Sequence, residues 1–404
     1  MTHIYKKVGC SVLVLLLLIG AVACDAFEAM GEPQQSDGVS ETEQGGEWGS
    51  DTLPQEQLTE QVTGQDTQTD LPATEQTTQP LDDPASNIVT PSEAGYTYPE
   101  LVEDLAALAQ TYGDHFSYRS IGKSVDGREI YACVVGNSNA EKKVLLTGGI
   151  HGKEYLSSLL VMTQMEYYLA NRESGSYNGL SYAELLDSHA FYVLPMINPD
   201  GIMLALCGID SMQTPEVRAT VEKVYADNLR DGLTTADDID AYLAYNWKAN
   251  ANGVDLNRNF ALSTWSEVRT GILSPCFRNY KGPSPASEPE TQAVSAYVES
   301  LGELEALLAF HTAGQVVYWD CGMTGGVRQQ TLELAQAVCE HTGYNLIYDK
   351  HLDASLNDWI TLDRGVPSVT VEIATVIYPM PTSELEAAFA QTKELWVVTA
   401  QLFG

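Results

Sequence analysis

Apolar and polar positions follow two different rhythms along residues 91–404. In one set of segments apolar residues recur at helical spacing, which predicts helices over 98–112, 156–171, 288–299, 329–342 and 385–403. A second set of short segments predicts strands, and several of them are continuous apolar runs, as in strands buried on both faces: 129–135, 143–147, 191–197, 306–311 and 368–373. Strands that alternate with helices indicate an α/β fold, a mixed, mostly parallel sheet sandwiched between helices. In such folds the active residues lie at the carboxyl ends of strands.

The N-terminus has the pattern of an export signal. Lys6 and Lys7 precede an apolar run over 11–19, which is too short to cross a bilayer, and small residues then lead to Cys24. This stretch resembles a bacterial lipobox. It predicts a lipoprotein signal peptide over 1–23, with Cys24 lipidated and the protein anchored to the outer face of the cytoplasmic membrane. An ordinary secretory signal cleaved after Ala23 is the alternative, and would give a secreted protein.

Residues 24–90 are predicted to form a disordered, acidic linker. Positions 25–90 contain 15 acidic residues and no Lys or Arg, mixed with Gln, Thr, Ser, Gly and Pro. Such a segment buries too little apolar surface to offset its chain entropy, and repulsion between like charges extends it. We therefore expect a tether that holds one folded domain, residues 91–404, away from the membrane.

Composition narrows the class of protein. The 404 residues include 21 Lys+Arg and 55 Asp+Glu, a net charge of −34, of which −21 belongs to residues 91–404. This excludes a nucleic-acid binder that relies on a basic face. Five cysteines follow Cys24, so at least one is unpaired if the exported domain forms disulfides, and a Cys207–Cys276 pair is conceivable.

Three residues at predicted strand ends could bind a metal. His151 and Glu154 follow an apolar strand, stand three residues apart and share a side at the opening of a helix. A neutral imidazole and a carboxylate could supply half of a Zn²⁺ site. His311 ends another apolar strand and could supply a third ligand, although a single histidine there is more often structural.

Two further segments carry candidate chemistry. Asn257 and Arg258 offer planar donors suited to a carboxylate, with a surface ion pair as the alternative for Arg258. Asp255 is suitably placed to hold a ligand histidine in one tautomer. Glu372 lies inside an apolar strand, which is costly unless the carboxylate is paired, metal-linked or catalytic. It is therefore a candidate general base.

Taken in order, these segments resemble the zinc carboxypeptidase family typified by carboxypeptidase A, over roughly residues 95–404. The resemblance is carried by His151-x-x-Glu154, Asn198-Pro199-Asp200-Gly201, Asn257-Arg258-Asn259, Ser287-Glu288-Pro289-Glu290, His311, Asp358-Trp359 and Glu372. It implies one Zn²⁺ per chain, bound by His151, Glu154 and His311. It also implies that Asp255 orients His151 and that Glu372 serves as general base and then general acid.

The resemblance assigns substrate contacts as well. Asn257 and Arg258 would bind the terminal carboxylate of the substrate. Lys248 stands where the family usually has an oxyanion-stabilising Arg, and keeps the charge without the planar fork. Tyr348 stands near the family's mobile substrate-capping Tyr, with a core aromatic as the alternative. Asn357 falls at the base of the specificity pocket, where a polar, uncharged residue argues against strongly aromatic substrates.

The chain is thus expected to be a zinc metallocarboxypeptidase that cuts peptide bonds near a free carboxyl end. Residues 198–260 resemble bacterial cell-wall members of the family, which cut γ-D-glutamyl–diamino acid bonds in peptidoglycan stem peptides. The alternatives are a general extracellular carboxypeptidase for nutrient peptides, a zinc deacylase of acylated amino acids, and a zinc-free surface module that binds peptides or glycans. The enzyme hypothesis requires Glu372 on the same side of the sheet as His151, Glu154 and His311.

Overall fold

The structure is a computed structural model and describes residues 87–92, 94–348 and 351–403. The predicted signal peptide, the lipidation site Cys24 and the linker up to residue 86 lie outside the described residues. No helix in the described part of the chain combines the length and the apolar character needed to cross a membrane.

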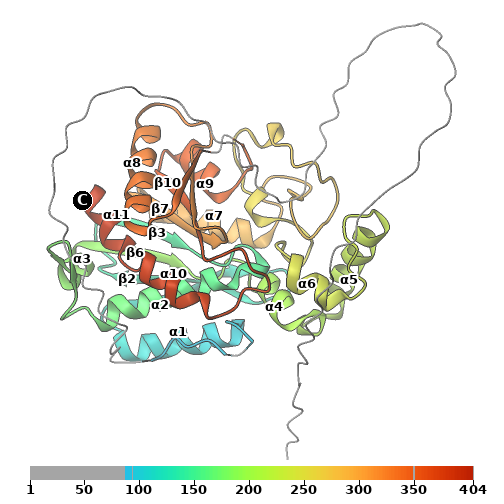
Figure 1. The fold of residues 1–404 in the computed structure, drawn as a ribbon, viewed down its shortest axis with the longest axis horizontal. Helices are drawn as coiled ribbons and strands as arrows, with labels where there is room; N and C mark the ends of the chain where they lie inside the picture. The colour runs from blue at the N-terminus through green and yellow to red at the C-terminus, as the bar shows by residue number, and fades with distance from the viewer. Residues whose placement is uncertain (1–86, 93, 349–350, 404) are drawn as a thin grey trace, which may run out of the picture. The chain divides into compact units, whose positions relative to one another are not determined.

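An eight-stranded sheet runs through the domain (Figure 1). Its spatial order is β1 (Phe116–Lys123), β2 (Glu129–Gly136), β6 (His189–Leu194), β3 (Lys142–Thr147), β7 (Ala306–Thr312), β10 (Ser368–Ile373), β8 (Val316–Trp319) and β9 (Asn345–Tyr348). Strands β6, β3, β7 and β10 pair in parallel, as do β8 and β9. The pairs β1–β2, β2–β6 and β10–β8 are antiparallel. The predicted mixed, mostly parallel sheet is confirmed.

The central strands are rich in apolar residues because each face of the sheet has its own core. In β3, Val144 and Leu146 enter one core and Leu145 enters the other. The same alternation in β7 sends Leu308 to the first core and Leu307 to the second. A strand covered on both faces therefore reads as a continuous apolar run.

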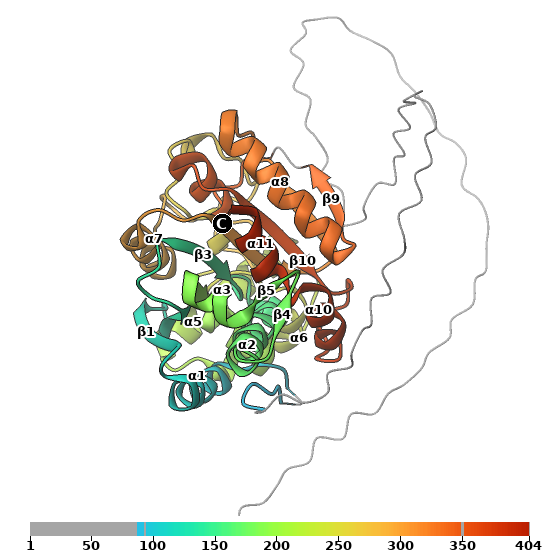
Figure 2. The ribbon, with the colours of Figure 1, turned by 90° about the vertical axis from the view of Figure 1, so that its left-hand side faces the viewer.

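Helices cover both faces (Figure 2). The larger core is built by α1 (Tyr98–Tyr112), α2 (Tyr155–Ala170), α3 (Tyr182–Ser188), α8 (Gly325–Thr342), α10 (Glu384–Thr392) and α11 (Leu395–Phe403). The opposite core is built by α7 (Pro289–Leu301) and by α9 (Leu356–Asp358) with the turn that follows it. A short hairpin, β4 (Ser176–Tyr177) and β5 (Leu180–Ser181), precedes α3.

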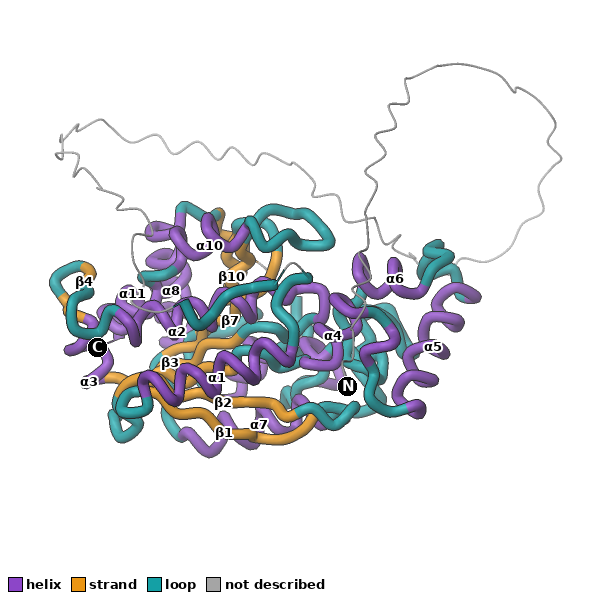
Figure 3. Tube along the Cα trace, turned by 90° about the horizontal axis from the view of Figure 1, so that it is seen from below, coloured by secondary structure: helices purple, strands orange, loops and turns teal. Residues whose placement is uncertain are grey.

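A third apolar cluster supports one end of the molecule. It contains residues of α4 (Pro199–Cys207), α5 (Pro215–Arg230) and α6 (Ile239–Asn246), which Figure 3 shows grouped together. Trp247 is fully buried in this cluster, directly after α6. The cluster therefore fixes the start of the chain segment that carries Lys248.

The single closing helix predicted over 385–403 is wrong, because α10 and α11 are separate. Two carbonyls at the break bond to side chains of α2: Thr392 O accepts from Gln164 Nε2 (3.2 Å) and Lys393 O from the Tyr168 hydroxyl (2.7 Å). At the same break the buried carboxylate of Glu394 accepts the Tyr182 hydroxyl (2.8 Å). These tertiary hydrogen bonds accompany the interruption of the helix.

A buried carboxylate holds the first described residues of the chain against the domain. The backbone N–H groups of Ile88 and Val89 both donate to the Glu166 carboxylate, each at 2.8 Å. Glu166 is only 6% exposed and belongs to α2, which is buried along most of its length. Two charge-assisted hydrogen bonds thus attach the first described residues to the core.

The cysteines of the described residues are all unpaired. The conceivable Cys207–Cys276 disulfide is therefore not formed in the structure. Cys207 is exposed at the end of α4, whereas Cys276 is buried in the third cluster.

Candidate metal centre and active site

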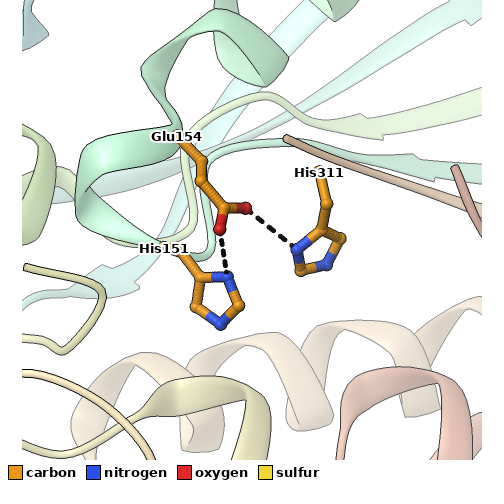
Figure 4. Close-up of side chains that lie close together, drawn as sticks. All are labelled: His151, Glu154 and His311. Carbon is orange, nitrogen blue, oxygen red and sulfur yellow. Dashed lines mark hydrogen bonds and ion pairs between the residues drawn. The ribbon is translucent and has the colours of Figure 1, made fainter. Parts of the chain in front are cut away.

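His151, Glu154 and His311 each place one ligand atom within 4.8 Å of the others (Figure 4). Glu154 lies between the imidazoles, with Oε1 3.0 Å from His151 Nδ1 and Oε2 3.1 Å from His311 Nδ1. Ligands bonded to one Zn²⁺ at about 2.1 Å lie roughly 3.0–3.4 Å apart for bond angles between about 90° and 109°. The three buried side chains therefore fit a single zinc ion.

A tight turn presents the first two of these residues. After β3 the chain passes through Gly148 and Gly149 to His151, and the short η1 turn (Gly152–Glu154) then opens α2. A Cβ on Gly152 would lie 2.4 Å from the Gly201 carbonyl oxygen, so no side chain fits there. This close packing against α4 fixes the position of the turn that carries His151 and Glu154.

Asp255 holds His151 in one orientation. Its Oδ1 lies 3.2 Å from His151 Nε2 and accepts the Asn257 N–H, while Oδ2 accepts the Asn279 N–H at 2.9 Å. Burial would raise the pKa of Asp255, but the His151 charge and hydrogen bond outweigh it and hold that pKa well below its usual range. When Nε2 donates to this carboxylate, the Nδ1 lone pair faces Glu154, as metal binding requires.

Glu372 lies on the required side of the sheet. In the parallel pair of β10 and β7, Glu372 is the register partner of His311. Directly paired residues share a face of the sheet. The residues on either side of Glu372, Val371 and Ile373, enter the larger core on the opposite face. Glu372 therefore faces the same space as the three candidate ligands.

The surroundings of Glu372 raise the affinity of its carboxylate for a proton. Its Oε2 is buried and has no hydrogen-bond partner among the described residues. Desolvation and the nearby Glu154 charge raise the pKa of Glu372 to about 8, against the opposing charge of Lys248. A carboxylate in these surroundings is more basic than one in water.

Lys248 places a cation beside the cluster, with Nζ 3.2 Å from Glu154 Oε1 and a side chain that is 28% exposed. Burial would lower the pKa of Lys248, but the charges of Glu154 and Glu372 outweigh it and raise that pKa above its usual value. Lys248 is therefore a permanent positive charge at the position where the sequence suggested an oxyanion contact.

One cavity, of about 280 Å³, joins the cluster to the predicted substrate residues. Its lining includes His151, His311, Lys248, Glu372, Asn257, Arg258 and Asn357. The Arg258 guanidinium is held in place by Nη1, which donates to Asn257 O at 2.9 Å. Asn257 is itself fixed, because its Oδ1 accepts the Leu356 N–H.

Tyr348 is placed differently from the other predicted residues. It lies on the edge strand β9, 48% exposed, with its ring centroid 5.6 Å from that of Trp319, and it is not among the residues that line the cavity. Its role as a substrate cap stays a prediction.

Several cavity residues had no signal in the sequence pattern. They come from the end of β8 and the turn after it, and from the segment before α9: Tyr318, Trp319, Asp320, Cys321, Met323, His351, Asp353 and Ser355. One of them, His351, is a histidine outside the three-residue metal cluster. The missed signal was β8 itself, whose four residues, VVYW, are all apolar but make a run too short to be recognised as a strand.

Known proteins share this arrangement of sequence and fold. A profile of the family described as zinc carboxypeptidase matches residues 101–394. Gamma-D-glutamyl-L-diamino acid endopeptidase 1 of Lysinibacillus sphaericus is 28% identical over 300 residues, covering 74% of this chain and 70% of that protein. Human mast cell carboxypeptidase A is 28% identical over 227 residues, covering 56% of this chain and 46% of that protein. The fold is similar to that of carboxypeptidase A from Helicoverpa armigera, with a TM-score of 0.57 and 17% identity over 78% of this chain and 76% of that one.

Proposed function

The chain belongs to the zinc carboxypeptidase family, and from this membership we propose that it hydrolyses stem peptides of peptidoglycan, at the bond between a γ-linked D-glutamyl residue and a diamino acid. The observation that carries hydrolysis is the convergence of His151, Glu154 and His311 in a cavity shared with Glu372. The choice of substrate is supported by the similarity to the Lysinibacillus sphaericus endopeptidase, which extends over 74% of this chain.

We assign the reaction steps to residues as follows. A bound Zn²⁺ would supply Lewis acidity, which polarises a carbonyl and lowers the pKa of water. Glu372 takes a proton from the attacking water at its unpartnered Oε2 and delivers that proton to the leaving amine. Lys248 provides positive charge for the oxyanion that develops on the scissile carbonyl.

Arg258 positions the substrate in this scheme. Its guanidinium lines the cavity that contains the three candidate ligands, so a carboxylate bound there would lie at a fixed place relative to the scissile bond. A clamp of this kind selects bonds near a free carboxyl end.

The function is tested by incubating the zinc-loaded protein with purified stem peptides and with a library of linear peptides, and identifying products by mass. We expect release of a diamino acid, or of a fragment beginning with one, and little cleavage when the free carboxylate is amidated. Broad trimming of linear peptides with no action on stem peptides would favour a nutrient carboxypeptidase. A folded protein that lacks stoichiometric zinc and cleaves nothing would favour a binding module.

We also propose that the enzyme is lipid-anchored through Cys24 to the outer face of the cytoplasmic membrane, with residues 24–90 as the tether. We expect Cys24→Ala to shift the protein from the membrane fraction to a soluble or uncleaved form and to abolish labelling by a fatty-acid analogue. Cys10→Ala, within the same signal sequence, is the matched control and should leave labelling intact. Unchanged membrane retention and labelling of Cys24→Ala would contradict the anchor.

A further inference from the structure

The cavity beside the candidate zinc site contains more carboxylates than its cations balance. Besides Glu372, its lining includes Asp320, Asp353 and Asp358, whereas Lys248 and Arg258 are its cationic residues apart from the histidines. A cavity built only for a substrate carboxylate has no need of additional acids. The position of each aspartate shows which of them can contact a substrate.

The carboxylates of Asp320 and Asp358 accept hydrogen bonds from other groups of the protein. Asp320 is 2% exposed, and its carboxylate accepts from Arg328 Nε and from the Gly322 N–H, each at 2.9 Å. Asp358 is 4% exposed, and its Oδ2 accepts the N–H groups of Asp353 (2.8 Å) and Ser355 (3.2 Å). Both carboxylates therefore stabilise the walls of the cavity.

Asp353 differs from these two aspartates because its carboxylate faces the guanidinium of Arg258. Its side chain is 36% exposed, and its Oδ2 lies 3.3 Å from Arg258 Nη2. Its backbone is fixed by the hydrogen bond to Asp358. The cavity thus presents a guanidinium and a carboxylate side by side, both partly accessible.

This pair discriminates between substrates by charge. A substrate carboxylate on Arg258 would place two carboxylates on one guanidinium, and like charges at this separation repel. A substrate that also brings an ammonium restores neutrality and gives Asp353 a partner. A side chain that carries no cation leaves the repulsion uncompensated.

A second acceptor points to the same ligand. Asn357 lines the cavity and donates its Nδ2 to Ser368 Oγ at 3.1 Å, while its buried Oδ1 has no hydrogen-bond partner among the described residues. An unsatisfied buried acceptor is costly, so a donor from the ligand is favoured there. An ammonium offers three donors and no acceptor.

We infer that the cavity selects a residue that carries both a carboxylate and a side-chain ammonium group, with Asp353 as the residue that selects the ammonium. The inference rests on the proposed function and deepens it, since a diamino acid linked through its α-amino group keeps its second amino group. Asp353 is a specificity residue, and takes no part in the bond cleavage.

The test compares two substrates that differ in the ammonium, γ-D-glutamyl-L-lysine and γ-D-glutamyl-L-norleucine. We expect the unmodified enzyme to favour the lysine compound in kcat/KM by about twofold to fivefold, the range for a partly exposed ion pair. Asp353→Asn should bring the ratio of the two kcat/KM values close to one, and Asp353→Glu should restore part of it. Asp363→Asn is the matched control, since that carboxylate binds Ser263 and does not line the cavity.

A binding measurement separates this inference from the reaction itself. In zinc-loaded Glu372→Gln protein, calorimetry should give tighter binding of free lysine than of norleucine, and Asp353→Asn should remove the difference. Equal kcat/KM values for the two substrates in the unmodified enzyme, or a ratio that Asp353→Asn leaves unchanged, would overturn the role of Asp353 while the hydrolase proposal stands. No hydrolysis of either compound, together with equal binding of both amino acids, would overturn both.

Discussion

Replacing Glu372 by Gln is expected to lower kcat by about 10²- to 10⁴-fold while the zinc content stays at one per chain. The amide keeps the volume of the side chain but cannot take a proton at the position of Oε2, which is buried and unpartnered in the described structure. Glu372 is not one of the three clustered ligand candidates, so metal binding should survive. The measurements are steady-state kinetics on a stem peptide and elemental analysis of the same preparation.

The matched control for this change is Glu129→Gln, which alters a carboxylate on β2 in a surface ion pair with Lys123. We expect it to keep activity within about twofold, because exposed ion pairs contribute little. A Glu372→Gln protein that retains a tenth or more of the activity with full zinc occupancy would remove Glu372 as the base. Loss of zinc from that variant would instead make Glu372 part of the metal site.

The second large effect is expected from Lys248→Met, about 10²- to 10³-fold in kcat, with KM changed much less. The methionine fills a similar space but brings no charge to the oxyanion that forms next to Glu154. Because Lys248 Nζ lies 3.2 Å from Glu154 Oε1, its removal also takes a cation away from the metal-binding carboxylate. Zinc affinity should therefore stay the same or rise, which a competition titration with a chelator can measure.

Two further variants complete the Lys248 experiment. Lys248→Arg should recover part of the activity, since it restores the charge with a different geometry. Lys281→Met is the control, because the Lys281 ammonium binds the carbonyls of Trp265 and Val268 and does not line the cavity. A fall in kcat/KM caused only by a higher KM would mean that Lys248 binds substrate without acting on the transition state.

The central sheet could be predicted because strands that are buried on both faces are rich in apolar residues. Strand β10 has the predicted bounds, 368–373, and β7 extends the predicted 306–311 by one residue. The edge strand β9, NLIY, has an apolar run of only three residues, and three of its four residues are exposed, so burial on both faces does not mark it in the sequence. It is a strand because its backbone pairs with β8, which apolar periodicity does not encode.

Only part of the candidate metal centre could be recognised from the local sequence. The spacing of His151 and Glu154 is set within one turn, so the sequence could suggest the pair. That Glu372 and His311 share a face follows from strand register, which a single sequence does not contain. Asp353 was missed because its proposed role depends on Arg258, which is 95 positions earlier in the chain. Only the fold brings Arg258 Nη2 to 3.3 Å from Asp353 Oδ2.

The two hydrogen bonds between Glu166 and the first described residues would have a mechanical consequence if the proposed tether is present. Tension on the chain ahead of Ile88 would enter the molecule at the far part of α2, about 18 Å along the helix axis from Glu154, which stands just before the same helix. Helix α2 is buried in the larger core, so the load would be shared as shear across many packed side chains. The arrangement of the candidate ligands would then be kept under tension on the proposed tether.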